Sequence, residues 1–303
     1  MLKKVAISIG DINGVGIQLA LENHHLISTL CKPIYCIDQK LLNKAAKALN
    51  LTIPKDFTLF GEYKKTEIHP GIVKKDSGLF SYNSFINAIS LAKKNEVDAI
   101  CTLPINKESW SKAGINYVGH TDMLRDIFQK DAIMMLGCEK MYVALFTEHI
   151  ALKKVPKQIK TKKLVTFLTD FYSAIGQPKE AIAVLGLNPH AGDNGVLGNE
   201  EEKIKKAIKK VNEKLKSNFE LQVPDIAFTP HTRKRYKYFV AMYHDQGLAP
   251  LKALHFEESI NISLNLPILR TSVDHGTAFD IAYKKDNNLS NKSYINAIKA
   301  AVN

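Results

Sequence analysis

Residues 4–28 read KVAISIGDINGVGIQLALENHHLIS and change from one structural pattern to another within a short distance. The first part, KVAISIG, is a short apolar run with β-branched residues, which predicts a buried strand. The glycine-rich segment GDINGVG follows, and the apolar residues after Gly16 then recur with the period of a helix. A strand, a glycine loop and a helix in this order are typical of an α/β protein.

The same alternation continues along the rest of the chain. Further strands are expected at 33–38, 97–104, 141–146, 181–187, 238–243, 259–265 and 267–272. Helices are expected at 17–28, 40–50, 83–94, 160–176, 199–216 and 293–302. Strands that alternate with helices favour a mainly parallel sheet, because a parallel connection needs a crossover of about helix length. No proline- or glycine-rich linker divides the chain, so any two domains are expected to be interwoven.

Composition places the chain among ordinary globular proteins. Its 303 residues, 45% of them hydrophobic, are enough for one large domain or two medium ones. The longest apolar runs are only strand-sized, so we expect no membrane span, and Asp11 interrupts the first run too early for a signal peptide. The four cysteines show no CxxC spacing, which favours buried free thiols in the reducing cytoplasm.

The net charge of +12 raises the question of nucleic-acid binding. Only four of the 42 basic residues are arginines, although bidentate recognition of bases and phosphates favours arginine. The lysines are scattered along helical faces, apart from one basic and aromatic cluster, TRKRYKY, at 232–238. We therefore expect a solvated lysine-rich surface and no nucleic-acid partner, while attraction of acidic substrates stays open.

Three of the expected strands lead into a histidine: His149, His190 and His244. Such a histidine is more often a hydrogen-bonded structural residue, but the carboxyl ends of parallel strands lie at one edge of a sheet. Three neutral imidazoles at that edge would form a catalytic-type site for zinc, cobalt or another first-row ion. Magnesium prefers oxygen ligands and suits three histidines less well.

Two glycine-rich segments are candidates for binding phosphate groups. GDINGVG matches neither GxGxxG nor a P-loop, so a tight turn explains it equally well. The segment HAGDNGVLGNEE (190–201) places Gly192, Gly195 and Gly198 between a strand and a helix. This second segment is the better candidate for a nucleotide or phosphate loop, although glycine, asparagine and aspartate also cluster in ordinary loops.

Several residues are suited to holding an anion. Lys252 and Arg270 lie in apolar surroundings, where a charge needs a partner, and Asn261 lies midway between them. An internal ion pair with Glu257 or Asp274 is the alternative. His120 and Thr121 of the segment GHTD add two potential donors, although Thr121 would equally serve as the N-cap of a helix at 122–129.

The assembled motifs resemble a known family, the 4-hydroxythreonine-4-phosphate dehydrogenases of vitamin B6 biosynthesis. The motifs are TLPINK, GHTDML, GLNPHAGDNGVLGNEE, AMYHDQGLAPLK and NISLNLPILRTSVDHGTA. The resemblance implies a fold related to the isocitrate and isopropylmalate dehydrogenases, with a cleft between two α/β/α domains. We expect residues 1–120 plus 265–303 in the first domain and residues 121–264 in the second. The resemblance also implies a homodimer, with the site at the subunit interface.

The resemblance assigns roles to the residues already singled out. The metal ligands of the family correspond to His149, His190 and His244, and its substrate-binding residues are His120, Thr121, Lys252, Asn261 and Arg270. We assign Gly192, Gly195 and Gly198 to the cofactor and Asp245 to orienting a metal ligand or accepting a proton. The implied cofactors are NAD or NADP and a divalent metal (Zn, Co or Mg).

The implied reaction is oxidation of 4-(phosphooxy)-L-threonine, followed by loss of carbon dioxide to give 3-amino-2-oxopropyl phosphate. A divalent ion would act as a Lewis acid for both steps.

The chain departs from the family in two segments. TPGDPAGIGPE is replaced by SIGDINGVGIQ, and GPLPADT is reduced to VPDIAF, which leaves Asp225 as the counterpart of the family's aspartate. The alternatives are a dehydrogenase of another phosphorylated hydroxy acid, a metal-dependent hydrolase and a non-catalytic lysine-rich binding protein.

Overall fold

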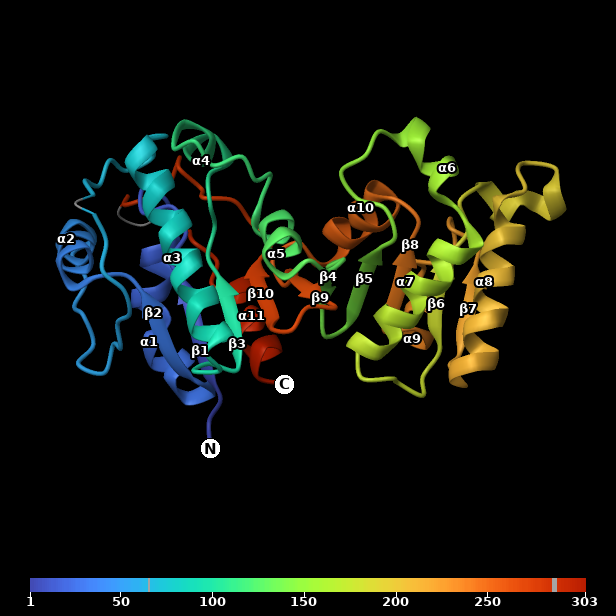
Figure 1. Ribbon diagram of the computed structural model, residues 1–303, viewed down its shortest axis with the longest axis horizontal. Helices are drawn as coiled ribbons and strands as arrows, with labels where there is room; N and C mark the ends of the chain where they lie inside the picture. The colour runs from blue at the N-terminus through green and yellow to red at the C-terminus, as the bar shows by residue number, and fades with distance from the viewer. Residues whose placement is uncertain (65, 285–287) are drawn as a thin grey trace. The chain divides into compact units, whose positions relative to one another are not determined.

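The chain divides into two compact units in the computed structural model, which describes residues 1–64, 66–284 and 288–303 (Figure 1). Unit 1 comprises Met1–Lys130, Ile260–Ile262 and Leu266–Asn303. Unit 2 comprises Asp131–Ser259 and Ser263–Asn265. Each unit contains both strands and helices, so the α/β class is confirmed. The units divide after Lys130, whereas the expected domain division lies after residue 120, and the domain boundaries stay a prediction.

Unit 1 is built on four parallel strands in the order β2-β1-β3-β10. Their bounds are Lys4–Ser8 for β1, Lys32–Cys36 for β2, Ala99–Thr102 for β3 and Leu269–Val273 for β10. The strand β9 (Ile260–Leu264) contributes residues to both units. The helices are α1 (Gly16–Leu30), α2 (Gln39–Leu49), α3 (Lys75–Lys93), α4 (Lys107–Lys112), α5 (His120–Phe128) and α11 (Lys292–Val302).

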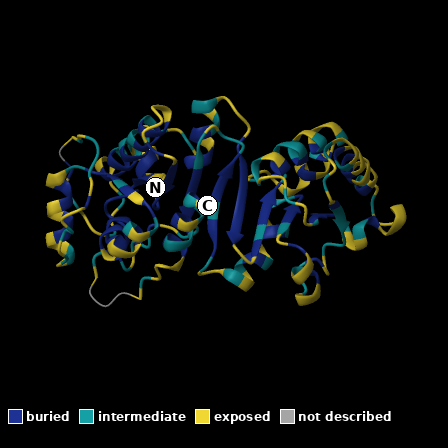
Figure 2. Cartoon of the chain, turned by 90° about the horizontal axis from the view of Figure 1, so that it is seen from below, coloured by how far each residue is buried: buried dark blue, intermediate teal, exposed yellow. Residues whose placement is uncertain are grey.

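Helices cover both faces of the unit 1 strands. Ile100 of β3 packs into an apolar cluster with Phe85 of α3. On β10, Thr271 is paired with Cys101, the next residue of β3, and its hydroxyl donates to the Ala297 carbonyl of α11 at 2.9 Å. Successive side chains of a strand point to opposite faces, so α3 and α11 lie on opposite sides. The strands, buried between them, are dark blue in Figure 2.

Unit 2 has five strands in the order β4-β5-β8-β6-β7. Their bounds are Ile133–Cys138 for β4, Met141–Leu145 for β5, Ile182–Leu185 for β6, Phe219–Gln222 for β7 and Tyr238–Ala241 for β8. The pair β4–β5 is antiparallel, and the pairs β5–β8, β8–β6 and β6–β7 are parallel. The expectation of a mainly parallel sheet is therefore met here too, although β4 and β7 were not predicted.

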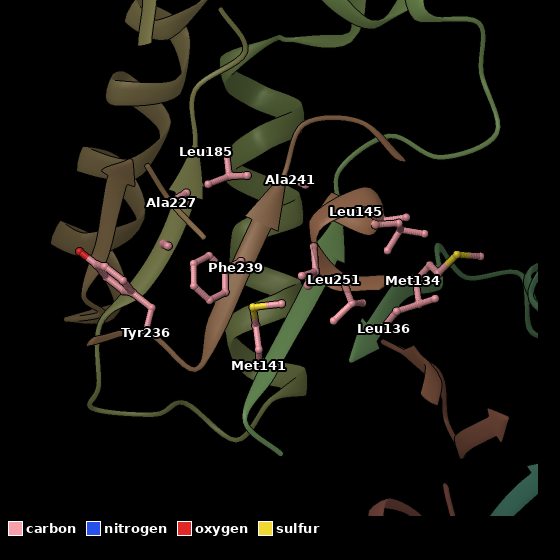
Figure 3. Close-up of a cluster of buried hydrophobic side chains, with 13 residues drawn as sticks. Met134, Leu136, Met141, Leu145, Leu185, Ala227, Tyr236, Phe239, Ala241 and Leu251 are labelled. Atoms are coloured by element: carbon pink, nitrogen blue, oxygen red, sulfur yellow. The ribbon is translucent and has the colours of Figure 1, made fainter. Parts of the chain in front are cut away.

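The helices of unit 2 include α10 (His244–His255), which directly follows β8 and packs against it. The unit also contains α6 (Val155–Gln158), α7 (Thr161–Ala174), α8 (Glu200–Leu215), α9 (Pro230–Arg235) and the 3₁₀ segments η1 (Leu152–Lys154) and η2 (Pro189–Gly195). Figure 3 shows side chains of β4, β5, β6, β8 and α10 meeting in one apolar cluster. A Cβ on Gly247 would lie 2.9 Å from the Ala241 Cβ, so this glycine lets α10 pack close to β8.

Some details of the expected secondary structure were wrong. Helix α5 begins at His120 after Gly119, and no side chain caps it, so the interpretation of Thr121 as an N-cap is wrong. Helix α3 begins at Lys75 rather than at residue 83, and α10 was not predicted. All four cysteines are free and buried, as expected. None of the helices in the described part of the chain has the length and hydrophobicity that crossing a bilayer requires.

Candidate metal and substrate sites

The three histidines of unit 2 follow the carboxyl ends of neighbouring parallel strands. β5, β8 and β6 lie side by side, so the chain leaves all three at the same edge. The strands end earlier than predicted: His149 lies beyond the end of β5, His190 lies in η2, and His244 is the first residue of α10. The histidines therefore belong to the connections above the strand ends, where ligands bind in open α/β sheets.

Two of these imidazoles lie next to each other. The ring centroids of His149 and His244 are 5.7 Å apart, and the side chains are 55% and 38% exposed. The Nδ1 atom of His244 lies 2.9 Å from the Asp245 carboxylate. When this Nδ1 donates its hydrogen to Asp245, Nε2 carries the lone pair that a metal needs, a common arrangement around metal-ligating histidines.

The third imidazole, His190, is exposed and lies in an irregular loop. Six consecutive residues, 190–195, have positive φ angles, which are unfavourable for the four of them that are not glycines. Among the described residues, the three histidines do not form a group whose ligand atoms all lie within 4.8 Å of one another. Their donor chemistry nevertheless fits a divalent ion of the zinc or cobalt type, because all three are accessible nitrogen ligands.

The glycine-rich segment that includes η2 and continues to α8 is organised by a buried carboxylate. Glu201 accepts hydrogen bonds from the backbone nitrogens of Leu187 and Asn188, each at 2.8 Å. A Cβ on Gly192 would lie 2.6 Å from a Glu201 oxygen, and one on Gly198 would collide with the Asn188 side chain. Packing therefore explains two of the three glycines assigned to the cofactor. Glutamates already fill the first turn of α8, which makes that helix end unfavourable for a phosphate group.

Unit 1 contains a buried cluster around Arg270, the second residue of β10, and Thr102, the last residue of β3. Its guanidinium donates to the Thr102 hydroxyl from Nε at 3.1 Å and from Nη2 at 2.6 Å, and Nη2 also lies 3.1 Å from the His120 Nδ1. Arg270 is only 3% exposed, and burial lowers its pKa to about 10, so it stays charged at neutral pH. Thr102 was not singled out from the sequence, although it opens the TLPINK motif.

The contact with Arg270 fixes the protonation of His120. A guanidinium only donates, so Nδ1 of His120 must accept and the hydrogen must lie on Nε2. Burial, together with the positive charge of Arg270, lowers the pKa of His120 well below its usual value, so the imidazole is neutral. Phe85 and Trp110 pack edge-on against the ring, with centroids at 4.5 and 5.7 Å. The result is a neutral, rigidly held N–H donor.

Among the buried polar atoms of unit 1 that have no hydrogen-bond partner within the described residues are Nε2 of His120 and Oδ1 of Asn261. Leaving such a group buried and unpaired costs about 1–3 kcal/mol, so a ligand that pairs with it gains that energy. Both belong to residues that we assigned to the substrate. Thr121 is buried beside His120 at the start of α5, whereas Lys252 lies in α10 of unit 2 with its ammonium 5.7 Å from the Phe256 ring centroid.

A different group in unit 2 has the ligand types of a metal site. The ligand atoms of Cys138, His255 and Glu258 lie within 4.8 Å of one another, the one such group among the described residues. This group was not predicted from the sequence, because Cys138 lies 120 positions before Glu258 in the chain. The ammonium of Lys140 lies 3.0 and 3.1 Å from the two Glu258 oxygens, so a cation already neutralises this carboxylate.

The chain is an α/β protein with three histidines at one edge of the unit 2 strands. In unit 1 it has a buried arginine beside polar atoms that lack a partner within the described residues. The family model of the pyridoxal phosphate biosynthetic protein PdxA matches residues 29–301. The chain therefore belongs to this family.

Individual relatives extend over the whole chain. It is 59% identical to the 4-hydroxythreonine-4-phosphate dehydrogenase of Sulfurimonas denitrificans, covering 99% of this chain and 97% of that protein. It is 56% identical to the Campylobacter fetus enzyme of the same name, covering 99% and 98%. A crystal structure of the Klebsiella pneumoniae 4-hydroxythreonine-4-phosphate dehydrogenase matches with a TM-score of 0.83 at 31% identity, covering 100% and 98%.

Proposed function

We propose that the protein is a 4-hydroxythreonine-4-phosphate dehydrogenase. It would oxidise the secondary alcohol of 4-(phosphooxy)-L-threonine by transfer of hydride to NAD⁺ or NADP⁺. The resulting β-keto acid would then lose carbon dioxide to give 3-amino-2-oxopropyl phosphate. The observation that carries the proposal is the likeness of the whole chain to curated dehydrogenases of that name. The dehydrogenase class implies a nicotinamide cofactor, and the donor set of unit 2 suits a divalent metal.

The residues of unit 2 would hold the metal. His149, His190 and His244 would supply three nitrogens, and Asp245 would keep the tautomer of His244 by accepting the hydrogen of Nδ1. A divalent ion bound there supplies Lewis-acid stabilisation of the negative charge that develops on the substrate oxygen. Zinc and cobalt fit three imidazoles better than magnesium does.

The residues of unit 1 would bind the anionic groups of the substrate. The N–H of His120 would donate to a phosphate or carboxylate oxygen, and the charge of Arg270 would stabilise the same anion. Thr102 and His120 hold the guanidinium in one orientation, so little side-chain entropy remains to be lost on binding. Oδ1 of Asn261 would accept from the substrate ammonium or hydroxyl, and Thr121 would complete the set in unit 1. Lys252 of unit 2 would be a further substrate-binding residue by the family resemblance.

Three further parts of the proposal concern the nucleotide loop, the assembly and the cellular compartment. Gly192, Gly195 and Gly198 would shape a loop beside the nicotinamide nucleotide, although packing against Glu201 and Asn188 accounts for two of them. A homodimer would place the site at the subunit interface, as the resemblance implies. Four buried free thiols are consistent with action in the reducing cytoplasm.

The test is reduction of NAD⁺ or NADP⁺ by purified protein with 4-(phosphooxy)-L-threonine, unphosphorylated 4-hydroxythreonine and a phosphorylated sugar acid as parallel substrates. The proposal predicts turnover with the first compound and much less with the second, because the phosphate contacts are lost. Turnover only with the sugar acid would move the assignment to another phosphorylated hydroxy acid. Release of inorganic phosphate without nicotinamide reduction would indicate a hydrolase and contradict the proposal.

A further inference from the structure

Side chains link the three histidine-bearing strand ends of unit 2. The hydroxyl of Thr147 donates to the backbone carbonyl of Met242 at 2.7 Å. The backbone N–H of Met242 donates to Oε1 of Gln246 at 2.7 Å. Nε2 of Gln246 in turn donates to the backbone carbonyl of Gly186 at 2.7 Å. We call this chain of three hydrogen bonds, from Thr147 through Met242 and Gln246 to Gly186, the strand-end brace.

Each backbone segment in the brace leads directly to one histidine. Thr147 precedes His149 after β5, Met242 precedes His244 after β8, and Gly186 precedes His190 after β6. The ladder bonds of these strands stop nearby, with the Phe146 N–H bonded to Ala241 at 2.9 Å. The brace thus continues the links between strands beyond the point where regular pairing ends.

Gln246 lies where one carboxamide can accept a hydrogen bond at one end and donate one at the other. It lies in the first turn of α10, and its side chain reaches back to the backbone N–H of Met242, which precedes the N-cap residue Tyr243. Its other end reaches across to the β6 end, so one carboxamide sets the positions of β8 and β6 relative to each other. A carboxylate of the same size can replace only the accepting half, because it has no hydrogen to give to Gly186.

We propose that Gln246 and Thr147 are positioning residues for the metal centre: the strand-end brace sets the spacing of His149, His190 and His244. The inference rests on the proposed function, which supplies the metal. Residues that orient ligands typically change metal affinity about 10- to 100-fold when they are replaced. Neither residue is among the proposed metal ligands or substrate-binding residues, and both bond to backbone groups, so each would act through the backbone that carries the ligands.

The test compares cobalt binding by metal-free protein in the absence of substrate and nucleotide. Absorption titrations with Co²⁺ give both the affinity and the d–d spectrum, and the titration of His244→Ala is subtracted to remove binding at Cys138, His255 and Glu258. The variants are Gln246→Leu, Gln246→Glu, Thr147→Val and Thr147→Ser. Thermal melting of each metal-free variant reports the integrity of the fold.

Asn212 offers a matched control within the same unit. Its half-buried carboxamide also joins a backbone N–H and carbonyl, both of Phe219, at 2.9 Å each. Phe219 begins β7, so Asn212→Leu breaks the same kind of bridge at the amino edge of the strands, away from the histidines. A loss of stability alone would therefore affect Asn212→Leu and Gln246→Leu alike.

The proposal predicts that Gln246→Leu and Thr147→Val lower the Co²⁺ affinity about 10- to 100-fold and alter the d–d spectrum. Thr147→Ser should restore both, Gln246→Glu should bind Co²⁺ more weakly than the wild type, and Asn212→Leu should melt earlier with unchanged affinity. If Gln246→Leu and Thr147→Val bound Co²⁺ with the affinity and spectrum of the wild type, the inference would be overturned. If the wild type also reduced nicotinamide, the proposed function would still stand. Failure of the wild type to bind Co²⁺ would overturn the metal assignment and the inference together.

Discussion

The residues assigned to the substrate and those assigned to the metal differ in how far the folded chain has already arranged them. In unit 1, Arg270 and His120 are buried, bonded to each other and surrounded by aromatic rings. In unit 2, His149 and His244 are half exposed, and His190 lies in a loop of unfavourable backbone angles. Burial pre-orders the first group, whereas the second keeps accessible nitrogens that a metal ion can gather.

This difference has a physical reason. A guanidinium and an imidazole bind an anion best when they are rigid and shielded from water, where each hydrogen bond is stronger. A metal ion contributes its own binding energy and can organise flexible ligands, so its site needs less order beforehand. Changes in unit 1 should therefore mainly alter substrate binding and stability, while changes in unit 2 should mainly alter metal content and turnover.

The largest effect is expected for a metal ligand. We predict that His244→Ala lowers kcat by about 1000-fold, because Lewis-acid catalysis contributes several kcal/mol and each 1.36 kcal/mol is a factor of ten. Bound metal and kcat would be measured together. His231→Ala, at an exposed histidine of α9, is the matched control and should retain both. Full activity in His244→Ala would show that His244 is not a ligand of a catalytic metal ion.

The next effect is expected for the arginine of unit 1. Arg270→Lys keeps the charge but loses the planar fork that bonds Thr102 and His120, so KM for the phosphorylated substrate should rise about 10- to 100-fold. KM for the nicotinamide nucleotide should change little. Arg235→Lys, at a largely exposed arginine paired with Glu220, is the control. Equal rises in both KM values would show a general distortion instead.

A smaller effect is expected for the hydroxyl that supports Arg270. Thr102→Val removes the acceptor of two donated hydrogen bonds, which should raise KM about 5- to 10-fold and lower the free energy of unfolding by about 1–2 kcal/mol. Thr102→Ser should recover most of both quantities. If Thr102→Val destabilised the fold without any change in KM, Thr102 would have no part in orienting the guanidinium.

The smallest effect concerns pH and stability. His120 has a lowered pKa in the folded protein, so below about pH 6.5 the unfolded chain binds a proton that the folded chain does not. Its contribution to stability is therefore complete above pH 6.5 and falls as the pH is lowered. Replacement by asparagine, His120→Asn, should reduce the loss of unfolding free energy between pH 7.5 and 5.5 by about 1 kcal/mol. Identical pH profiles in urea unfolding would contradict a neutral buried His120.

Periodicity predicted the elements that alternate in the chain, but it failed where local signals were weak. The strand β7 was missed because FELQ is short and half polar, and β4 because a glycine interrupts its apolar run. Helix α10 was missed because Gly247 and Pro250 both count against a helix, whereas packing on β8 requires the glycine. Tertiary contacts decided these cases.

In the candidate site, too, some residues could be recognised from local sequence signals and others only from tertiary contacts. Strand-end placement and residue type were enough to single out His149, His190 and His244, and a charge in an apolar segment was enough to single out Arg270. Thr102 could not be recognised, because a threonine at a strand end is common and its role depends on a partner 168 positions away in the chain. Gln246 was not predicted to have a role, because only its bonds to Met242 and Gly186 connect it to the histidines.

The measurement that tests the account most directly is chelation of the wild-type protein followed by metal add-back, with nicotinamide reduction by 4-(phosphooxy)-L-threonine as the readout. The account predicts that turnover disappears on chelation and returns with zinc or cobalt in the wild type, but not in His244→Ala. Turnover that persists in fully metal-free protein would contradict a metal-dependent dehydrogenase built on these three histidines.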